Sequence, residues 1–228
     1  AITAEIQALA DGLEGDPVLL YQFVQNTIDF DCVWTSRRDA TQALLDGIGN
    51  AFDQSALLVA LLRASGYEAG FVQGKVRLPI AAAANWIGCS EDRMVVANNF
   101  QRGGIPVGVG STFVEIEHVW VSATIGRAEH VLDPSFKPYT ELAGIAIEAA
   151  MGYDRQQFLA AAFDGATVTD HAVVDFDATN LDAKLTEYTM ALVGHIRENM
   201  PNAHREEVFG GRTITRVELD ALPPAPDY

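Results

Sequence analysis

The spacing of apolar residues in the first quarter of the chain has the period of α-helices. Residues 3–12 carry this period, and a second helix is predicted from Pro17 to about Asn26. Asp16 stands before that proline as the expected N-cap, because an N-cap residue followed by proline commonly starts a helix. A shorter helix is predicted over residues 39–45, and the looser alternation of residues 28–34 is consistent with a short strand.

The segment from Phe52 to Ala64 is apolar on nearly every side of the helix that it predicts. Such a helix has no solvated face, so we expect it to be buried on all sides. Asn50 is placed to cap its N-terminus, and Gly66 is placed to end it. The sequence therefore predicts a central buried helix, against which other elements pack.

Two longer segments have the alternation of β-strands. Residues 69–78 form the first, with an interruption expected at Gly74. Residues 113–123 form the second, which places His118 and Trp120 on one face because side chains alternate along a strand. These strands follow the buried helix in the chain, so we expect them to form the sheet on which it packs.

The rest of the chain is predicted to be mostly helical. Residues 129–132 return as the partner strand of a hairpin, and helices are expected near residues 140–150, 154–163 and 179–199. Helices and strands are therefore segregated along the chain. This order predicts an α+β fold with a buried central helix packed on an antiparallel sheet, plus a helical C-terminal extension.

We expect the chain to divide into a core over residues 1–139 and a mostly helical extension over residues 140–228 that packs on the core. The ending from Leu222 to Pro226 is rich in proline, which is typical of a linker. We therefore expect the chain to be part of a larger protein, with other domains of that protein among its partners.

Charge and cysteine content narrow the possible functions. The 31 acidic and 15 basic residues give a formal charge of −16, which disfavours nucleic-acid binding. No apolar run is long enough for membrane insertion, so we expect a soluble protein, with an exported or cell-surface location left open. Cys32 and Cys89 are too few for a disulfide framework and lack the spacing of a metal motif. No metal and no cofactor are therefore expected.

Three short segments carry side chains that could act together: Gly49–Gln54 at the start of the buried helix, Glu117–Val121, and Leu132–Phe136. A buried helix N-terminus favours negative charge and would lower the pKa of a thiol placed there. His118 on an adjacent strand could accept the proton of such a thiol. Asp133 on the next strand could fix the tautomer of that histidine.

The segment from Gly49 to Gly66 resembles the core helix of the transglutaminase-like superfamily, in which Gly-x-Cys-x-Asp precedes an apolar helix. The strand His118-Val-Trp-Val resembles the family's His-x-Trp-Val strand, and Asp133-Pro-Ser its Asp-Pro-Ser/Thr strand. The resemblance extends over about residues 17–139, and further segments are similar to a bacterial branch found within large multidomain proteins. It implies a papain-like cysteine-hydrolase fold and a chemistry of thiol acyl transfer or amide hydrolysis.

The resemblance also implies the roles of individual residues. Ala51 occupies the nucleophile position, where the family has cysteine, whereas His118 matches the base and Asp133 the acid that orients it. The candidate substrate contacts beside them are Asn50, Trp34 and Trp120. Alanine offers no nucleophile, so the acyl-transfer reaction of the family does not carry over to this sequence.

Three interpretations remain open. The chain is a pseudoenzyme with a natural alanine, or an active cysteine protease, amidase or transglutaminase in which Ala51 is an introduced replacement of cysteine. In the third interpretation the domain uses its cleft only to bind a peptide or protein ligand. The acidic surface would then favour a basic or neutral ligand.

Overall fold

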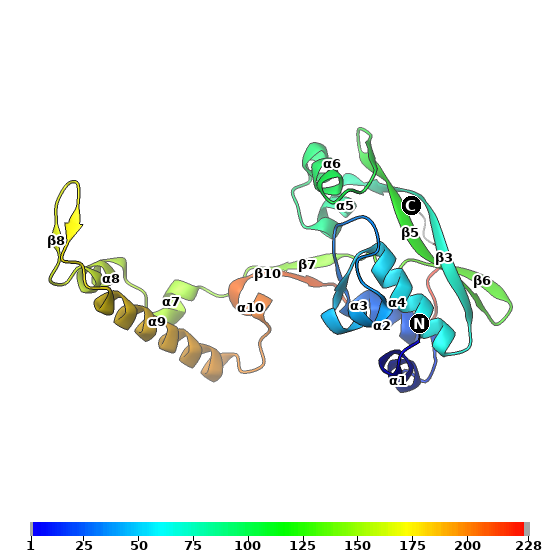
Figure 1. Ribbon diagram of the computed structural model, residues 1–228, viewed down its shortest axis with the longest axis horizontal. Coiled ribbons are helices and arrows are strands. Elements are labelled where there is room, and N and C mark those ends of the chain that lie inside the picture. The colour runs from blue at the N-terminus through cyan, green and yellow to red at the C-terminus, as the bar shows by residue number, and fades with distance from the viewer. Residues whose placement is uncertain (1, 226–228) are drawn as a thin grey trace. The chain divides into compact units, whose positions relative to one another are not determined.

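The computed structural model describes residues 2–225, and Figure 1 shows their elements. It contains two compact units. The first runs to Thr140 and also includes the segment from Ile214 onward, and the second spans Glu141–Thr213. Each is described by itself, and the division expected at residues 139 and 140 stays a prediction.

Helices and strands of the first unit follow one another in a mixed order, and the antiparallel pairing of its main sheet confirms the predicted α+β fold class, while two short strands pair in parallel. Its helices are α1 (Ala4–Gly12), α2 (Pro17–Thr27), α3 (Ala40–Asp46), α4 (Ala51–Ala64), α5 (Ile80–Ile87) and α6 (Arg93–Arg102). Its strands are β1 (Asp29–Phe30), β2 (Ile48–Gly49), β3 (Glu68–Pro79), β4 (Val107–Val109), β5 (Phe113–Ile125) and β6 (Ala128–Leu132). Strand β7 (Tyr139–Leu142) pairs with β10 (Gly211–Ile214).

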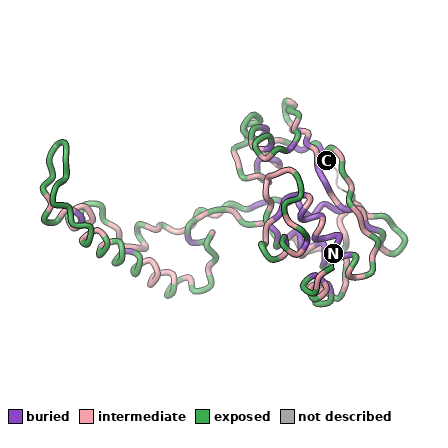
Figure 2. The backbone as a smooth tube through the Cα atoms, viewed as in Figure 1, coloured by how far each residue is buried: buried purple, intermediate pink, exposed green. Residues whose placement is uncertain are grey.

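Helix α4 is the centre of the first unit, as the sequence predicts. It packs against α1, α2 and α3 and against strands β3 and β5, and Figure 1 shows it between the other N-terminal helices and the sheet. Its buried leucines, among them Leu57, Leu58 and Leu61, form one apolar cluster with Val121 and Ala123 of β5. In Figure 2 the purple, buried part of the tube is concentrated in this unit.

Strand β5 buries opposite faces in its two halves. Val114 and Ile116 point into a second apolar cluster with side chains of α5 and α6, whereas Val121 and Ala123 point toward α4. The pairing with β3 runs from Phe113 to Thr124 without a break, so no bulge causes the change of buried face. The buried face changes because helices cover opposite faces of the sheet along the two halves of β5. The second cluster surrounds the even-numbered face that carries His118.

Several local predictions are wrong for identifiable reasons. Strand β3 continues through Gly74, because the ring of Trp120 lies where a side chain would stand: a Cβ there would be 2.9 Å from Cη2 of Trp120. Of the strand expected over residues 28–34, only Asp29–Phe30 form a strand, β1. Of the helix expected over residues 140–150, the first residues belong to strand β7 instead. Pairing with a distant strand overrides local propensity at β7.

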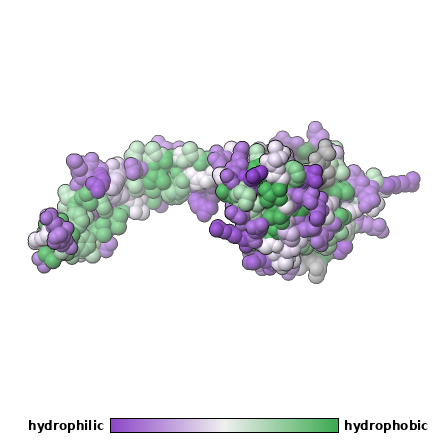
Figure 3. Space-filling model, turned by 90° about the horizontal axis from the view of Figure 1, so that it is seen from above, coloured by the Kyte–Doolittle hydropathy of each residue, from purple (hydrophilic) through white to green (hydrophobic). Residues whose placement is uncertain are grey.

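The second unit has a small core. Its elements are α7 (Ile147–Met151), α8 (Arg155–Ala162), β8 (Thr167–Val168), β9 (Val173–Val174), α9 (Ala178–Asn199) and α10 (Arg205–Phe209). Tyr153 and Phe158 pack on Tyr188 of α9, with ring centroids 5.5 Å and 6.2 Å from it. Apolar residues also lie on the surface of this unit, as Figure 3 shows in green.

A buried lysine ties the C-terminus of α2 to α4. The ammonium of Lys137 donates to the carbonyl oxygens of Val24 and Ile28, at 3.2 Å and 2.7 Å, and to Oε1 of Gln54 at 2.8 Å. These acceptors match its three N–H groups. Burial lowers the pKa of Lys137 to about 7, although the carboxylates of Asp133 and Asp29 oppose the shift.

This lowered pKa makes stability depend on pH. Between pH 7 and the ordinary lysine pKa of 10.5 the unfolded chain keeps a proton that the folded chain has released, so the free energy of unfolding rises with pH. We expect Lys137→Met to remove this rise, which amounts to about 1 kcal/mol per pH unit. Urea unfolding of both proteins at pH 7, 8 and 9 measures the difference, and parallel profiles would contradict it.

Candidate functional site

The N-terminus of α4 is held by a reciprocal cap. Oδ1 of Asn50 accepts a hydrogen bond from the backbone N–H of Asp53 at 3.0 Å, and Oδ2 of Asp53 accepts one from the N–H of Asn50 at 3.3 Å. Both side chains are buried. Two N–H groups at the start of the helix are thereby satisfied inside the protein.

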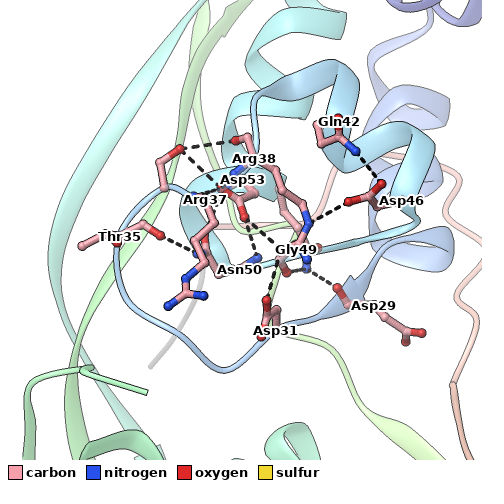
Figure 4. A network of polar contacts seen from close by, with 12 residues as sticks. Asp29, Asp31, Thr35, Arg37, Arg38, Gln42, Asp46, Gly49, Asn50 and Asp53 are labelled. Atoms are coloured by element: carbon pink, nitrogen blue, oxygen red, sulfur yellow. Dashed lines mark hydrogen bonds and ion pairs between the residues drawn. The ribbon is translucent and has the colours of Figure 1, made fainter. Parts of the chain in front are cut away.

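The carboxylate of Asp53 also organises the loop before α3, as Figure 4 shows. Its Oδ1 accepts from the backbone N–H groups of Arg37 and Arg38, at 3.0 Å and 3.1 Å, and from Oγ of Ser36 at 3.4 Å. The negative charge is placed at the positive end of the helix dipole, which favours it. One buried carboxylate therefore connects the loop to the start of α4.

Arg38 brings further carboxylates to this network. Its guanidinium contacts Asp31 at 3.1 Å and Asp46 at 3.0 Å, and lies 3.7 Å from Asp53. The hydrogen bonds to Asp46 and Asp31 raise the pKa of Arg38 above its ordinary value. Arginine suits this position because its fork of donors reaches several carboxylates at once.

The same loop contains a strained residue. Thr35 has a φ of 74°, in the left-handed region that β-branched residues avoid. Its carbonyl oxygen accepts a hydrogen bond of 2.6 Å from Nδ2 of Asn50. The cap of α4 thus holds the loop in a conformation that threonine would not adopt by itself.

A second buried polar group is formed by β5 and the segment after β6. Nε2 of His118 and Oδ2 of Asp133 are 2.8 Å apart. The other oxygen of Asp133 accepts from Oγ and from the backbone N–H of Ser135, at 2.8 Å and 2.9 Å, and from the N–H of Phe136 at 3.2 Å. The carboxylate is fixed from both sides and can hold the imidazole in one orientation.

The tautomer of His118 follows from this contact. A hydrogen bond to the carboxylate requires the proton on Nε2, so Nδ1 presents its lone pair. Within residues 2–225, Nδ1 accepts no hydrogen bond. The ring therefore has one nitrogen oriented by an acid and one left as a proton acceptor, which is the arrangement that a general base needs.

Aromatic side chains enclose the imidazole. Trp86 of α5 meets it edge-on with centroids 5.5 Å apart, and Trp120 stacks beside it at 6.0 Å. Nε1 of Trp86 also donates to the carbonyl oxygen of Ser135 at 2.8 Å. His118 and Asp133 are both buried, so their hydrogen bond is shielded from water.

Ala51 is the first residue of α4, and it is buried. It precedes Gln54 by three residues and Ser55 by four, so the three share one face of the helix. Gln54 contacts Lys137, just beyond the Asp133 segment, and Oγ of Ser55 donates to the carbonyl oxygen of Val119 at 3.4 Å. Helix α4 thus contacts, through Ser55, the residue that follows His118, and the position of Ala51 at the pair stays a prediction.

Comparison with known protein families supplies the context for this geometry. The transglutaminase-like superfamily matches residues 1–132, which is more than half of the chain. The chain belongs to the transglutaminase-like superfamily. No curated protein and no solved structure matches it. The matched region includes α4 and β5 and ends immediately before Asp133.

The other candidate residues of this transglutaminase-like domain lie in two places. Trp120 stacks on His118, whereas Trp34 packs edge-on against Phe52 of α4, with centroids 4.9 Å apart. Asn50 uses both ends of its side-chain amide in the cap of α4 and its loop. The roles of Asn50, Trp34 and Trp120 in binding a substrate stay predictions.

Three side chains around the pair were not singled out from the sequence. Ser135 and Trp86 contact it as described, and the hydroxyl of Tyr21 donates to the carbonyl oxygen of Asp133 at 2.9 Å. Burial, followed by the negative charge of Asp133, raises the pKa of Tyr21. Only Ser135 had a signal in the sequence, through its place in the Asp-Pro-Ser motif.

Within residues 2–225, the cysteines and the acidic residues indicate no second catalytic site and no metal site. Burial and the nearby Asp31 raise the pKa of Cys32 to about 12, which leaves its thiol protonated and a poor nucleophile. Among the described residues, no group of three or more His, Cys, Asp or Glu side chains could hold a metal ion. Within the same part of the chain, every helix is too short or too polar to cross a membrane.

The cap network makes a prediction about stability. Replacing Asp53 by alanine leaves the buried N–H group of Asn50 and the partly buried N–H groups of Arg37 and Arg38 without their acceptor, so we expect a loss of about 3 kcal/mol in the free energy of unfolding. Asp46→Asn, which removes only a half-exposed partner of Arg38, should cost less than about 1 kcal/mol. Urea unfolding compares the variants, and equal losses would contradict a central role of Asp53.

Proposed function

We propose that this chain is a pseudoenzyme of the transglutaminase-like superfamily, which retains the base and its orienting acid and serves as a module that binds a peptide or protein ligand. The observation that carries the proposal is the buried pair of His118 and Asp133, together with a helix that begins with Ala51 and packs on β5, the strand of His118. The methyl group of alanine cannot attack a carbonyl. Loss of a nucleophile removes about six orders of magnitude of rate in a serine protease.

The acyl-transfer reaction of the family requires a sulfur atom at position 51, which this chain lacks. A cysteine at position 51 would lose its proton to Nδ1 of His118, and its sulfur would attack an amide carbon. The C–N bond would then break, the amine would leave with the proton from the imidazolium, and a thioester would remain for water or another amine. Asp133 and His118 supply the proton steps, but nothing at Ala51 supplies the sulfur.

The proposal predicts no turnover for the chain as it stands. In a glutamine-donor assay with an amine acceptor, and in an amide-hydrolysis assay, the rate should equal that of the His118→Ala variant. The comparison uses the histidine variant because it separates catalysis at this site from background hydrolysis. A rate that is clearly higher and that disappears with His118→Ala would overturn the assignment as a pseudoenzyme.

One observation favours a second candidate, an active cysteine enzyme in which alanine replaces the nucleophile: the proton-accepting nitrogen of His118 is unused. Ala51→Cys tests this candidate. We expect an active site of this kind to lower the thiol pKa at least about one unit below the free value of 8.5, through the helix N-terminus and the imidazolium.

The thiol pKa is measured from the pH dependence of iodoacetamide labelling, with each cysteine quantified by mass spectrometry. Cys32 serves as a slow internal reference, because burial raises its pKa to about 12. Adding Asp133→Asn to Ala51→Cys should raise the pKa of the new thiol again. A new thiol that titrates near 8.5, with or without Asp133, would exclude the second candidate and leave the binding module.

A further inference from the structure

Strand β3 forms an open edge of the main sheet. It pairs with β5 on one side, and β4 and β6 pair with β5 on the other, so β3 lies at the end of the strand order. The register with β5 shows which residues of β3 bond to it. The backbone N–H of Ile80 donates to the carbonyl oxygen of Thr112, whereas the N–H of Glu117 in β5 points away from β3 and donates to the carbonyl oxygen of Pro106. Even-numbered residues of β3 therefore bond to β5, and odd-numbered ones point their backbone groups outward.

Beyond Ala69, the outward groups are unpaired along the first half of β3. Ala69 is occupied, because the guanidinium of Arg63 donates to its carbonyl oxygen at 2.7 Å and 2.9 Å. For Phe71 and Gln73, no backbone hydrogen bond toward the open edge exists within residues 2–225. An edge of this kind is a template for another strand.

Only the second half of β3 carries the residues that usually protect an edge. Lys75, Arg77 and Pro79 follow one another at alternate positions, and charged residues and proline are the common means of blocking strand addition. From Ala69 to Gly74 there is no charged residue and no proline. The unprotected part of the edge therefore coincides with Phe71, whose side chain is 56% exposed.

A groove lies beside this part of the edge. Its first hollow, of about 430 Å³, is lined by Ser36, Phe52, Ala56, Phe71, Gln73 and Val119. A second hollow, of about 460 Å³, shares Ser36, Ala56 and Phe71 with the first and extends along α4 to Arg63. Phe71 and Gln73 thus present both their backbone groups to the edge and their side chains to the groove. We call this combined surface the β3 groove.

Two cations mark the ends of the β3 groove. Arg63 lines the second hollow, and within residues 2–225 it has no carboxylate partner. Lys75 is two residues beyond Gln73 on the same face, and it shares Glu115 with Arg77, which lies closer to that carboxylate. Arg63 and Lys75 therefore each offer a cation to a negatively charged group, although Asp39 also lines the second hollow and Glu117 lies opposite Lys75 on β5. The middle of the groove is mostly apolar.

We propose that the β3 groove binds an extended peptide that adds a strand to Ala69–Lys75, with apolar side chains in the hollow and a carboxylate near each end. The proposal rests on the binding function proposed above and names its ligand class. A strand opposite these residues has seven positions, of which the first, third, fifth and seventh face the groove. The groove-facing order is then acidic, apolar, apolar, acidic.

The overall charge of −16 favours a basic ligand at long range. At physiological ionic strength, charges farther apart than about 8 Å are largely screened, so the cations at the groove determine which charged groups bind there.

A second copy of this chain fits the edge poorly. Antiparallel pairing of two β3 edges centred on Val72 would bring Ala69, with its bound Arg63, opposite Lys75 of the other copy, and like charges there repel.

The probe is the capped peptide Glu-Thr-Leu-Thr-Val-Thr-Glu, added to the full chain at physiological ionic strength. Binding is followed by the tryptophan fluorescence of the chain, to which Trp34, packed on Phe52 of the groove, contributes with Trp86 and Trp120. The matched control, Glu-Thr-Thr-Leu-Val-Thr-Glu, has the same composition, but its leucine and valine are adjacent and so face opposite sides of the strand in every register. We expect the probe to bind at least about 10-fold more tightly than the control, because only its pattern puts both leucine and valine into the hollow.

Backbone pairing is tested by N-methylation of the probe. Methyl groups on one alternate set of its amides should abolish binding, and methyl groups on the other set should not, because only one set faces β3. Gln73→Pro, which removes an outward N–H that β5 does not use, should weaken binding at least about 10-fold. Arg63→Gln should weaken the acidic probe but not a version that ends in threonine.

The outcomes separate this proposal from the proposed function. Equal binding of probe and control, or weakening by both sets of methyl groups, overturns the β3 groove as a strand-adding site. Sedimentation that shows a dimer dissociated by Gln73→Pro overturns it in favour of pairing between copies. Turnover by the unmodified chain would instead refute the pseudoenzyme and leave the result for the groove unchanged.

Discussion

The buried carboxylate of Asp53 is the constraint on which the first unit depends. It lies at the positive end of α4, closes the cap with Asn50 and accepts the backbone N–H groups of Arg37 and Arg38. A charge in that position is tolerable only because every oxygen is engaged and the helix dipole favours it. The start of α4, the strained Thr35 and the loop that borders the β3 groove are therefore set by one side chain.

A second polar cluster fixes the other side of the same helix. Lys137 binds Gln54 and the end of α2, and Gln54 in turn donates to the carbonyl oxygens of Asp29 and Gly49. The chain around Lys137 also carries Asp133 and Ser135, so the segment that orients His118 is the one that anchors α4. The start of α4 is thus held by hydrogen bonds on both sides, and none of them requires a nucleophile at position 51.

The sequence predicted the elements whose signals are local. The Asp16-Pro17 start of α2, the Asn50 cap and the all-round apolar pattern of α4 depend on neighbouring residues, and all three are confirmed. Helix α6 was missed although Asp92 caps it, because its mean apolar content is low. Gly74 was misread because only the ring of Trp120, 46 residues away, explains it. The hydrogen bonds of Tyr21 to Asp133 and of Lys137 to α2 and Gln54 had no signal in the sequence for the same reason.

The retention of His118 and Asp133 beside an alanine has a physical explanation that does not require catalysis. Both are buried, and removing either one would leave the other without its hydrogen-bond partner, at a cost of about 1–3 kcal/mol or more. Replacing a small buried thiol by a methyl group loses only a minor contact. A domain that stops catalysing can therefore lose its nucleophile freely, while stability keeps the histidine and the acid in place. The intact pair is therefore compatible with the proposed pseudoenzyme, and the reactivity of a thiol introduced at position 51 reports whether the site can still activate a nucleophile.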